Sequence, residues 1–110
     1  MFDMKAYQRE YHKKRWSKKE ERAYRAARNK QNRANCMAYQ RGIKERTPCA
    51  DCKRHFHFAA MDFDHVRGKK IERIAELAKR GAFKMMIAEI EKCEIVCSNC
   101  HRVRTFVRQQ

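Results

Sequence analysis

The chain has 110 residues, of which 37% are charged, with 28 Lys and Arg against 13 Asp and Glu and a formal net charge of +15. This length allows one small domain with little room for a large core, and only three Gly and one Pro favour helices over a β-sandwich. So large a positive excess destabilises a compact chain by self-repulsion and is typical of proteins that bind a polyanion. No signal peptide or membrane-length segment is visible, and no strongly amphipathic face accompanies the charge, so we expect a cytoplasmic protein with no membrane partner.

Residues 1–47 are predicted to be a basic, mainly helical extension that binds DNA. They carry 15 Lys and Arg against five acids, and their Ala, Arg, Lys and Gln content favours helix. Ser17 followed by Glu20 is the pattern of a capping box, so we expect two helices, near 3–15 and 18–40. A thin apolar stripe on the second helix consists of Ala23, Ala27, Ala34 and Ala38.

Residues 48–110 are predicted to form a second unit of short strands and helices. Alternating aromatic and polar residues predict a strand over about 55–65. Apolar residues at helical spacing predict one helix from Ile71 to Gly81 and another over 83–90. A very short strand at 94–96 precedes a last helix with Ser98 as its N-cap. In that helix we expect an inward face of Val103, Phe106 and Val107 and an outward face of Arg102, Arg104 and Arg108.

The cysteines indicate a structural metal site. Cys49 and Cys52 form one CxxC pair, and Cys97 and Cys100 form a second pair 44 residues later. Cytoplasmic thiols stay reduced, and two such pairs supply the four sulfur ligands of a tetrahedral Zn²⁺ with no open position for chemistry. Metal binding would also stabilise a domain this small. The two remaining cysteines lie on predicted helical stripes and are expected to be buried as small hydrophobic residues: Cys36 and Cys93.

A second group of residues lies between the zinc ligands. Asp64 and His65 end the predicted strand, and His101 directly follows the last zinc cysteine. If the two CxxC pairs meet, these three side chains become neighbours. A carboxylate and an imidazole can hold Mg²⁺ or Mn²⁺, and a second imidazole can act as a general base. Because adjacent strand residues face opposite sides, we expect the chain to bend at Asp64 and His65, which residues 66–68 directly after them would permit.

The order of these motifs resembles the zinc-bearing branch of the HNH, or ββα-metal, nucleases and is similar to small phage HNH endonucleases. The resemblance covers about residues 49–105. It implies an α+β fold with a zinc-stabilised ββα-metal domain over 48–110, which cuts DNA, expected to be double-stranded, in a bacterial or phage-infected cytosol. It further implies that His65 is the general base and that Asp64 and His101 hold the catalytic ion, which is Mg²⁺ or Mn²⁺, with Zn²⁺ or Ni²⁺ as alternatives. The expected ends are 5′-phosphate and 3′-hydroxyl.

One position departs from the family pattern. The family's central Asn, which mainly braces the loop around the base, is Lys92 in this chain, so the loop must be held in another way. Basic residues near the predicted site are expected to bind flanking phosphates: Arg67, Lys69, Lys70, Arg102 and Arg104.

Two other functions fit parts of the sequence. A zinc-stabilised nucleic-acid-binding protein without catalysis explains the cysteines and the charge, but it gives no reason for a DH pair and a histidine beside the zinc ligands. A dithiol redox protein needs a single reactive CxxC and no large positive charge.

Overall fold

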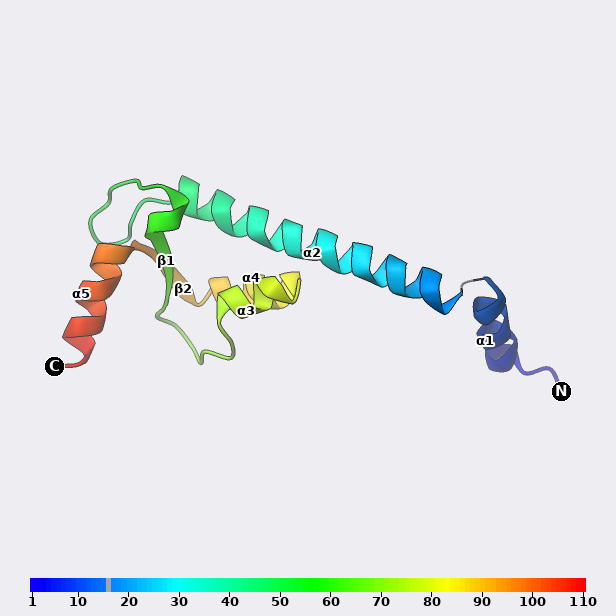
Figure 1. Cartoon of the computed structure of the whole chain (residues 1–110). Helices are drawn as coiled ribbons and strands as arrows, with labels where there is room; N and C mark the ends of the chain where they lie inside the picture. Colours follow the sequence, from blue (N-terminus) through cyan, green and yellow to red (C-terminus); the bar gives the residue numbers. More distant parts are fainter. Residues whose placement is uncertain (16) are drawn as a thin grey trace.

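The protein is an elongated molecule of 69 × 27 × 19 Å, in which two helices lead into a small mixed unit (Figure 1). The computed structural model describes residues 1–15 and 17–110, and Trp16 lies outside the described residues. Helix α1 spans Met4–Arg15 and helix α2 spans Lys18–Arg46. At 1.5 Å per residue, α2 is about 43 Å long, and it runs from α1 to the vicinity of both strands (Figure 1). No described helix combines the length and the apolar character needed to cross a membrane.

The predicted capping box begins α2. The Ser17 hydroxyl accepts a hydrogen bond from the Glu20 backbone N–H at 3.1 Å, and the Glu20 carboxylate accepts one from the Ser17 N–H at 3.4 Å. The helix continues to Arg46, past the predicted end near residue 40. The four alanines of the thin apolar stripe are exposed. The packed face lies further along α2 and consists of Cys36, Tyr39 and Ile43.

Two short helices pack against the C-terminal half of α2 (Figure 1). They are α3 (Ile74–Lys79) and α4 (Phe83–Ile90), so the first starts later than predicted and leaves Ile71 71% exposed. Gly81 joins them at a φ of +68°, and a Cβ atom there would lie 2.8 Å from the Asn32 Cβ on α2. A glycine therefore permits both the turn and the close approach of the hairpin to α2. The core between these helices consists of Cys36, Ile74, Leu77, Ala78, Met86, Ile90 and Cys93.

Two strands form an antiparallel sheet. Strand β1 (Met61–His65) pairs with β2 (Cys93–Cys97) in a register that sets Met61 opposite Cys97 and His65 opposite Cys93. The prediction of a strand from residue 55 is wrong: residues 55–57 are irregular and a 3-10 turn, η1, spans Phe58–Ala60. Among the described residues this sheet has two strands, so each of them is paired along one edge. The α+β class predicted from the sequence is confirmed.

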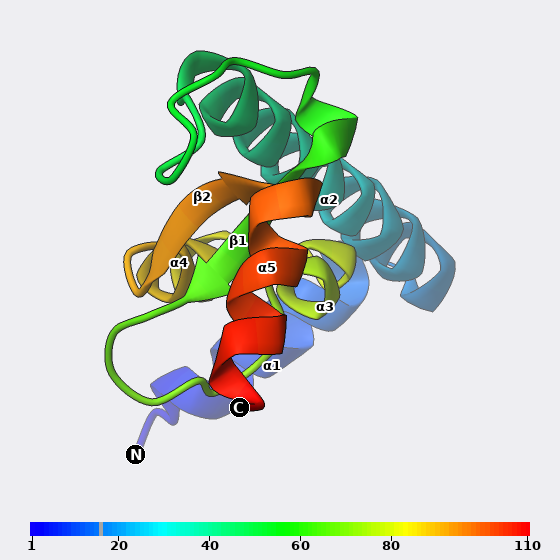
Figure 2. The same cartoon turned by 90° about the vertical axis from the view of Figure 1, so that its left-hand side faces the viewer.

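Helix α5 (Ser98–Arg108) lies across the sheet (Figure 2). Its N-cap is Cys97, not the predicted Ser98, because the Cys97 sulfur accepts a hydrogen bond from the Cys100 N–H at 3.4 Å. The predicted faces of α5 are also wrong. The apolar residues expected to be inside are 61–62% exposed, namely Val103, Phe106 and Val107, and arginine side chains lie against the sheet instead.

A second small core surrounds the end of the sheet near the cysteines. It consists of Cys49, Met61, Ile95, Val96 and Cys97. The predicted burial of the two other cysteines is confirmed, since Cys36 and Cys93 are both in the first core. The buried apolar residues form two small clusters and not one large core. The segment after α2 is therefore held to the sheet by few buried apolar side chains. A bound metal would add a strong link at that point.

Candidate metal centre and histidine groove

Four cysteines from two distant segments form one cluster, which we call the four-cysteine cluster: Cys49, Cys52, Cys97 and Cys100. Their sulfur atoms all lie within 4.8 Å of one another. The first pair lies on the turn after α2, where the Lys53 N–H donates to the Cys49 carbonyl at 2.9 Å. The second pair lies at the end of β2 and the start of α5. The cluster could hold one metal ion such as Zn²⁺.

Backbone N–H groups donate hydrogen bonds to sulfur atoms of this cluster and so favour the thiolate form that binds a cation. The Cys97 N–H donates to the Cys49 sulfur at 3.3 Å, and the Cys100 N–H donates to the Cys97 sulfur at 3.4 Å. Burial raises the pKa of the Cys49 thiol, but backbone N–H groups of Cys97, Cys52 and Asp51 outweigh it and lower that pKa to about 6. Thiolates are the metal-binding form of cysteine. The donor set therefore fits a structural zinc ion whose coordination is complete with protein ligands.

Asp64 and His101 come together beside this cluster, one on β1 and one on the first turn of α5. The His101 Nε2 lies 3.7 Å from Asp64 Oδ1, and its Nδ1 lies 3.1 Å from Asp62 Oδ2. Asp62 shares the sheet face of Asp64 because the two residues are two positions apart on a strand. Sequence reasoning missed Asp62, although the same alternation could have indicated it. Among the described residues, only the four cysteines bring three or more ligand atoms within 4.8 Å.

Asp64 is only 4% exposed and is held by two arginines of α5. Arg108 donates to both of its oxygens and Arg104 to one, each at 2.8 Å. The Arg108 guanidinium, followed by that of Arg104, outweighs the effect of burial and holds the pKa of Asp64 at about 2. The carboxylate is therefore ionised at neutral pH.

Arg104 faces the sheet, and the prediction that it faces outward is wrong. Its guanidinium also donates to Asp51 at 2.6 Å and to Glu94 at 3.2 Å. Asp64 and Glu94 are paired across β1 and β2, so their two carboxylates lie side by side on the sheet face that α5 covers. These carboxylates explain why arginines rather than valines occupy the inner face of α5.

His65 lies on the opposite face of β1 and meets a buried acid of α4. Its Nε2 is 3.1 Å from Glu89 Oε2, while Glu89 Oε1 accepts a hydrogen bond from Lys92 Nζ at 2.7 Å. Glu89 is 3% exposed. The pKa of the Glu89 carboxyl is lowered, mainly by the Lys92 ammonium. Burial acts to raise this pKa, whereas His65 and the backbone N–H of Ile71 lower it further. The predicted bend at Asp64 and His65 is wrong, because β1 stays paired through His65.

Lys92, which departs from the HNH pattern that the sequence resembles, holds the loop that follows His65. Its carbonyl accepts hydrogen bonds from the N–H groups of Val66 (2.9 Å) and Arg67 (3.0 Å). Its ammonium donates to the Lys69 carbonyl at 2.9 Å as well as to Glu89. One side chain and one carbonyl thus connect the loop to the buried carboxylate beside His65.

The predicted phosphate-binding residues have different surroundings. The Arg67 guanidinium donates to the carbonyls of Glu91 and Cys93. It therefore stabilises the loop after β1. Lys69, Lys70 and Arg102 are exposed.

Both predicted histidines line one groove of about 350 Å³ beside β1, which we call the histidine groove. His65 and His101 reach it from opposite faces of the strand, because β1 has β2 on only one side. Three cations also line the groove: Lys44 from α2, and Lys70 and Arg73 from the segment before α3. Positive side chains beside two imidazoles form a surface suited to a phosphate group.

Two further residues of this region were missed by sequence reasoning, namely Lys44 and Glu89. Lys44 is distant in sequence, and its ammonium lies 4.8 Å from the centre of the Phe63 ring. Glu89 carried a usable signal, because it is an acid that lies with Met86 and Ile90 on the buried face of α4.

The region therefore has two parts built on one two-stranded sheet. The four-cysteine cluster joins the turn after α2 to the start of α5. The histidine groove lies along β1. The acids Asp64 and Glu89, which are both buried, lie on opposite sides of that strand. Comparisons of the chain with protein-family models, with curated proteins and with solved structures find no match.

Proposed function

We propose that the chain is a metal-dependent endonuclease of the HNH type that hydrolyses phosphodiester bonds of DNA and leaves 5′-phosphate and 3′-hydroxyl ends. The observation that carries the proposal is the histidine groove, in which His65 and His101 line one surface with three cations and a buried, ionised Asp64 lies 3.7 Å from His101. The +15 net charge supports a polyanionic substrate.

The donor set beside the groove fits a second divalent ion. Two ligand atoms of an octahedral ion with bonds of about 2.1 Å are about 3 Å apart, and the Asp64 and His101 atoms are 3.7 Å apart. Arg108 would have to leave Asp64, and it lies in the last turn of α5 with its side chain 51% exposed. When bound, such an ion stabilises charge on the phosphate oxygens and on the leaving oxygen. Carboxylate and imidazole ligands suit Mg²⁺ or Mn²⁺, with Zn²⁺ or Ni²⁺ as alternatives.

The remaining steps belong to the chain's own side chains. With the Nε2 proton of His65 donated to the Glu89 carboxylate, the lone pair on Nδ1 is free to take a proton from a water molecule. That water attacks the phosphorus in line with the 3′ oxygen, the bond from phosphorus to that oxygen breaks, and the leaving oxygen takes a proton from solvent. Lys44, Lys70 and Arg73 offset the negative charge of the phosphate in the groove. In this scheme Glu89 is a positioning residue, because it acts through His65.

Replacing Glu89 with Gln is expected to slow cleavage by about 10–100-fold, the size typical of losing a group that orients an imidazole. Gln keeps the size of the side chain but removes the charge that fixes the proton on Nε2. Nitrogen NMR of the His65 ring should show that proton on Nε2 in the wild type and a mixture of both forms in the variant. Glu76→Gln, which changes an exposed acid of α3, is the control and should match the wild type.

A purely structural Glu89 would give another pattern. In that case Glu89→Gln would lower the melting temperature while leaving the His65 ring form and the cleavage rate per folded molecule unchanged.

A second function is favoured by one observation. Both oxygens of Asp64 are engaged by Arg104 and Arg108, an arrangement suited to a permanent structural ion pair. In a zinc-stabilised nucleic-acid-binding protein without catalysis, these arginines would never release the carboxylate, and the histidine groove would only hold a phosphate.

Incubation with supercoiled plasmid distinguishes the two functions. The nuclease proposal expects nicked or linear product with Mg²⁺ or Mn²⁺ and none without added divalent ions. The ends should carry a 5′-phosphate, detected because label enters only after phosphatase treatment. Intact plasmid across the divalent ions, together with clear DNA binding, would establish the non-catalytic alternative.

A further inference from the structure

The two N-terminal helices form a basic surface at one end of the molecule. Helix α1 and the first half of α2 meet at a corner away from the sheet (Figure 1). Apart from Ala6, the residues over 1–31 whose burial is described are exposed. We call α1 with residues 18–31 of α2 the basic arm. Residues 1–31 of the chain hold 11 Lys and Arg against four acids, so this region carries far more positive than negative charge.

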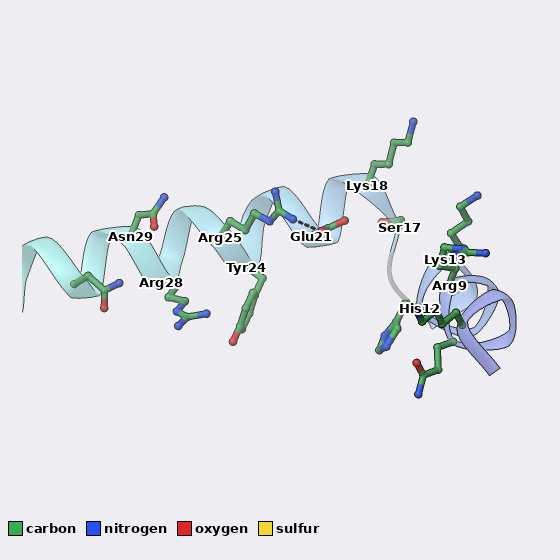
Figure 3. Close-up of a pocket in the computed structure, with 13 residues that line it drawn as sticks. Arg9, His12, Lys13, Ser17, Lys18, Glu21, Tyr24, Arg25, Arg28 and Asn29 are labelled. Atoms are coloured by element: carbon green, nitrogen blue, oxygen red, sulfur yellow. Dashed lines mark hydrogen bonds and ion pairs between the residues drawn. The ribbon is translucent and has the colours of Figure 1, made fainter. Parts of the chain in front are cut away.

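A groove of about 1400 Å³ runs between the two helices of the arm. Six cations of the described residues line it: Lys5, Arg9 and Lys13 from α1, and Lys18, Arg25 and Arg28 from α2. Figure 3 draws these lining residues and labels Arg9, Lys13, Lys18, Arg25 and Arg28 among them, together with Tyr24 and Asn29. Among the described lining residues the single acid is Glu21, and Arg25 pairs with it at 2.6 Å. The remaining cations give the groove a strong positive field.

The cations of α2 extend over a length that can contact several phosphates. Lys18 and Arg28 are ten residues apart on one helix, a rise of about 15 Å. Duplex DNA presents one negative charge for about every 1.7 Å of its axis, so several phosphates lie within that length. A membrane surface would require an apolar face beside the charges, whereas the groove is lined by Gln, Asn, Ser and His side chains among its cations.

We propose that the basic-arm groove binds the phosphate backbone of duplex DNA and anchors it at a place separate from the histidine groove. This inference takes its substrate class from the proposed nuclease function, but the binding itself does not require cleavage. In a molecule 69 Å long, an anchor at the α1–α2 corner and a groove at β1 contact one duplex at two separate places. The anchor reads no base sequence, because its contacts are with phosphates.

The test compares two triple variants of α2 that remove the same charge. The groove variant is Lys18→Gln, Arg25→Gln and Arg28→Gln. The control variant, Lys19→Gln, Arg22→Gln and Lys30→Gln, changes exposed cations of the same helix that do not line the groove. Both are made in full-length, metal-loaded His65→Ala protein, and binding to a fluorescent duplex of about 20 base pairs is followed by anisotropy at several salt concentrations.

We expect the groove variant to raise Kd by more than tenfold and to lower the slope of log Kd against log salt by about 2 to 3, since each lost phosphate contact removes about 0.9. The control variant should change Kd less than threefold. Equal weakening by the two variants, or no weakening by either, would overturn the proposal. Binding to phosphatidylserine vesicles in preference to the duplex would overturn it as well.

These results can be separated from the fate of the nuclease proposal. A chain that never cuts plasmid can still show the predicted difference between the two variants. If the chain cuts plasmid but the two variants bind the duplex equally well, the nuclease proposal stands and the anchor proposal fails.

Discussion

Removal of the metal ion from the four-cysteine cluster is expected to unfold the sheet and α5. A structural zinc ion contributes about 10–16 kcal/mol of apparent binding free energy, as much as the entire stability of about 5–15 kcal/mol that is usual for a folded domain. The cores on either side are small. Chelation should remove one zinc ion per chain by native mass spectrometry and abolish the dispersed amide NMR signals of β1 and β2. Added Zn²⁺ should restore them.

Two cysteine variants make this prediction specific. Cys97→Ser removes one of the four sulfur ligands but keeps the backbone N–H that donates to Cys49 and a hydroxyl that can cap α5, so we expect loss of the ion and of the dispersed spectrum. Cys36→Ala removes a thiol that is equally buried but lies in the other core, and it should keep both. An unchanged spectrum after chelation would mean that the four sulfurs are a packing cluster and not a metal site.

His101→Ala is expected to abolish cleavage while leaving the fold and the zinc ion intact. The variant removes one of the ligands proposed for the second ion, on which several kcal/mol of transition-state stabilisation depend. The rate should therefore fall by at least about 100-fold, since each 1.36 kcal/mol is a factor of ten. The side chain is 33% exposed, so little packing is lost. Plasmid cleavage, zinc content and melting temperature are measured on the same preparation.

The next residue provides the control. Arg102→Ala changes an exposed side chain one position further along α5 and should weaken DNA binding modestly without changing the rate at saturating DNA. Wild-type cleavage by His101→Ala would remove this residue from the proposed site. Loss of the zinc ion in this variant would instead give His101 a structural role.

The sequence predicts the parts of the fold that depend on local patterns. Ser17 and Glu20 are three residues apart, and a capping box needs no other information. The spacing of the two CxxC pairs likewise predicts a cluster of four sulfur atoms that could hold a metal ion. The inner face of α5 could not be predicted this way, because its arginines lie inward only when Asp64 and Glu94 are paired across the sheet. An apolar periodicity alone favoured Val103 and Phe106, which are exposed.

The arrangement around His65 also depends on long-range contacts. Strand alternation correctly raises the problem that Asp64 and His65 face opposite sides. A bend was the expected answer, whereas the structure keeps β1 straight and lets both histidines reach the histidine groove beside the strand. The link from Lys92 through Glu89 to His65 joins α4, β1 and the loop after it. Such a contact becomes visible only once those elements are packed.

The most direct measurement of the central claim is the plasmid cleavage rate of wild type and of His65→Ala, each shown to be folded with one bound zinc ion. A general base contributes about 10²–10⁴-fold, so the account predicts metal-dependent cleavage by the wild type and a loss of that size in the variant. Equal rates in the two proteins, or no cleavage by a folded wild type that still binds DNA, would contradict it.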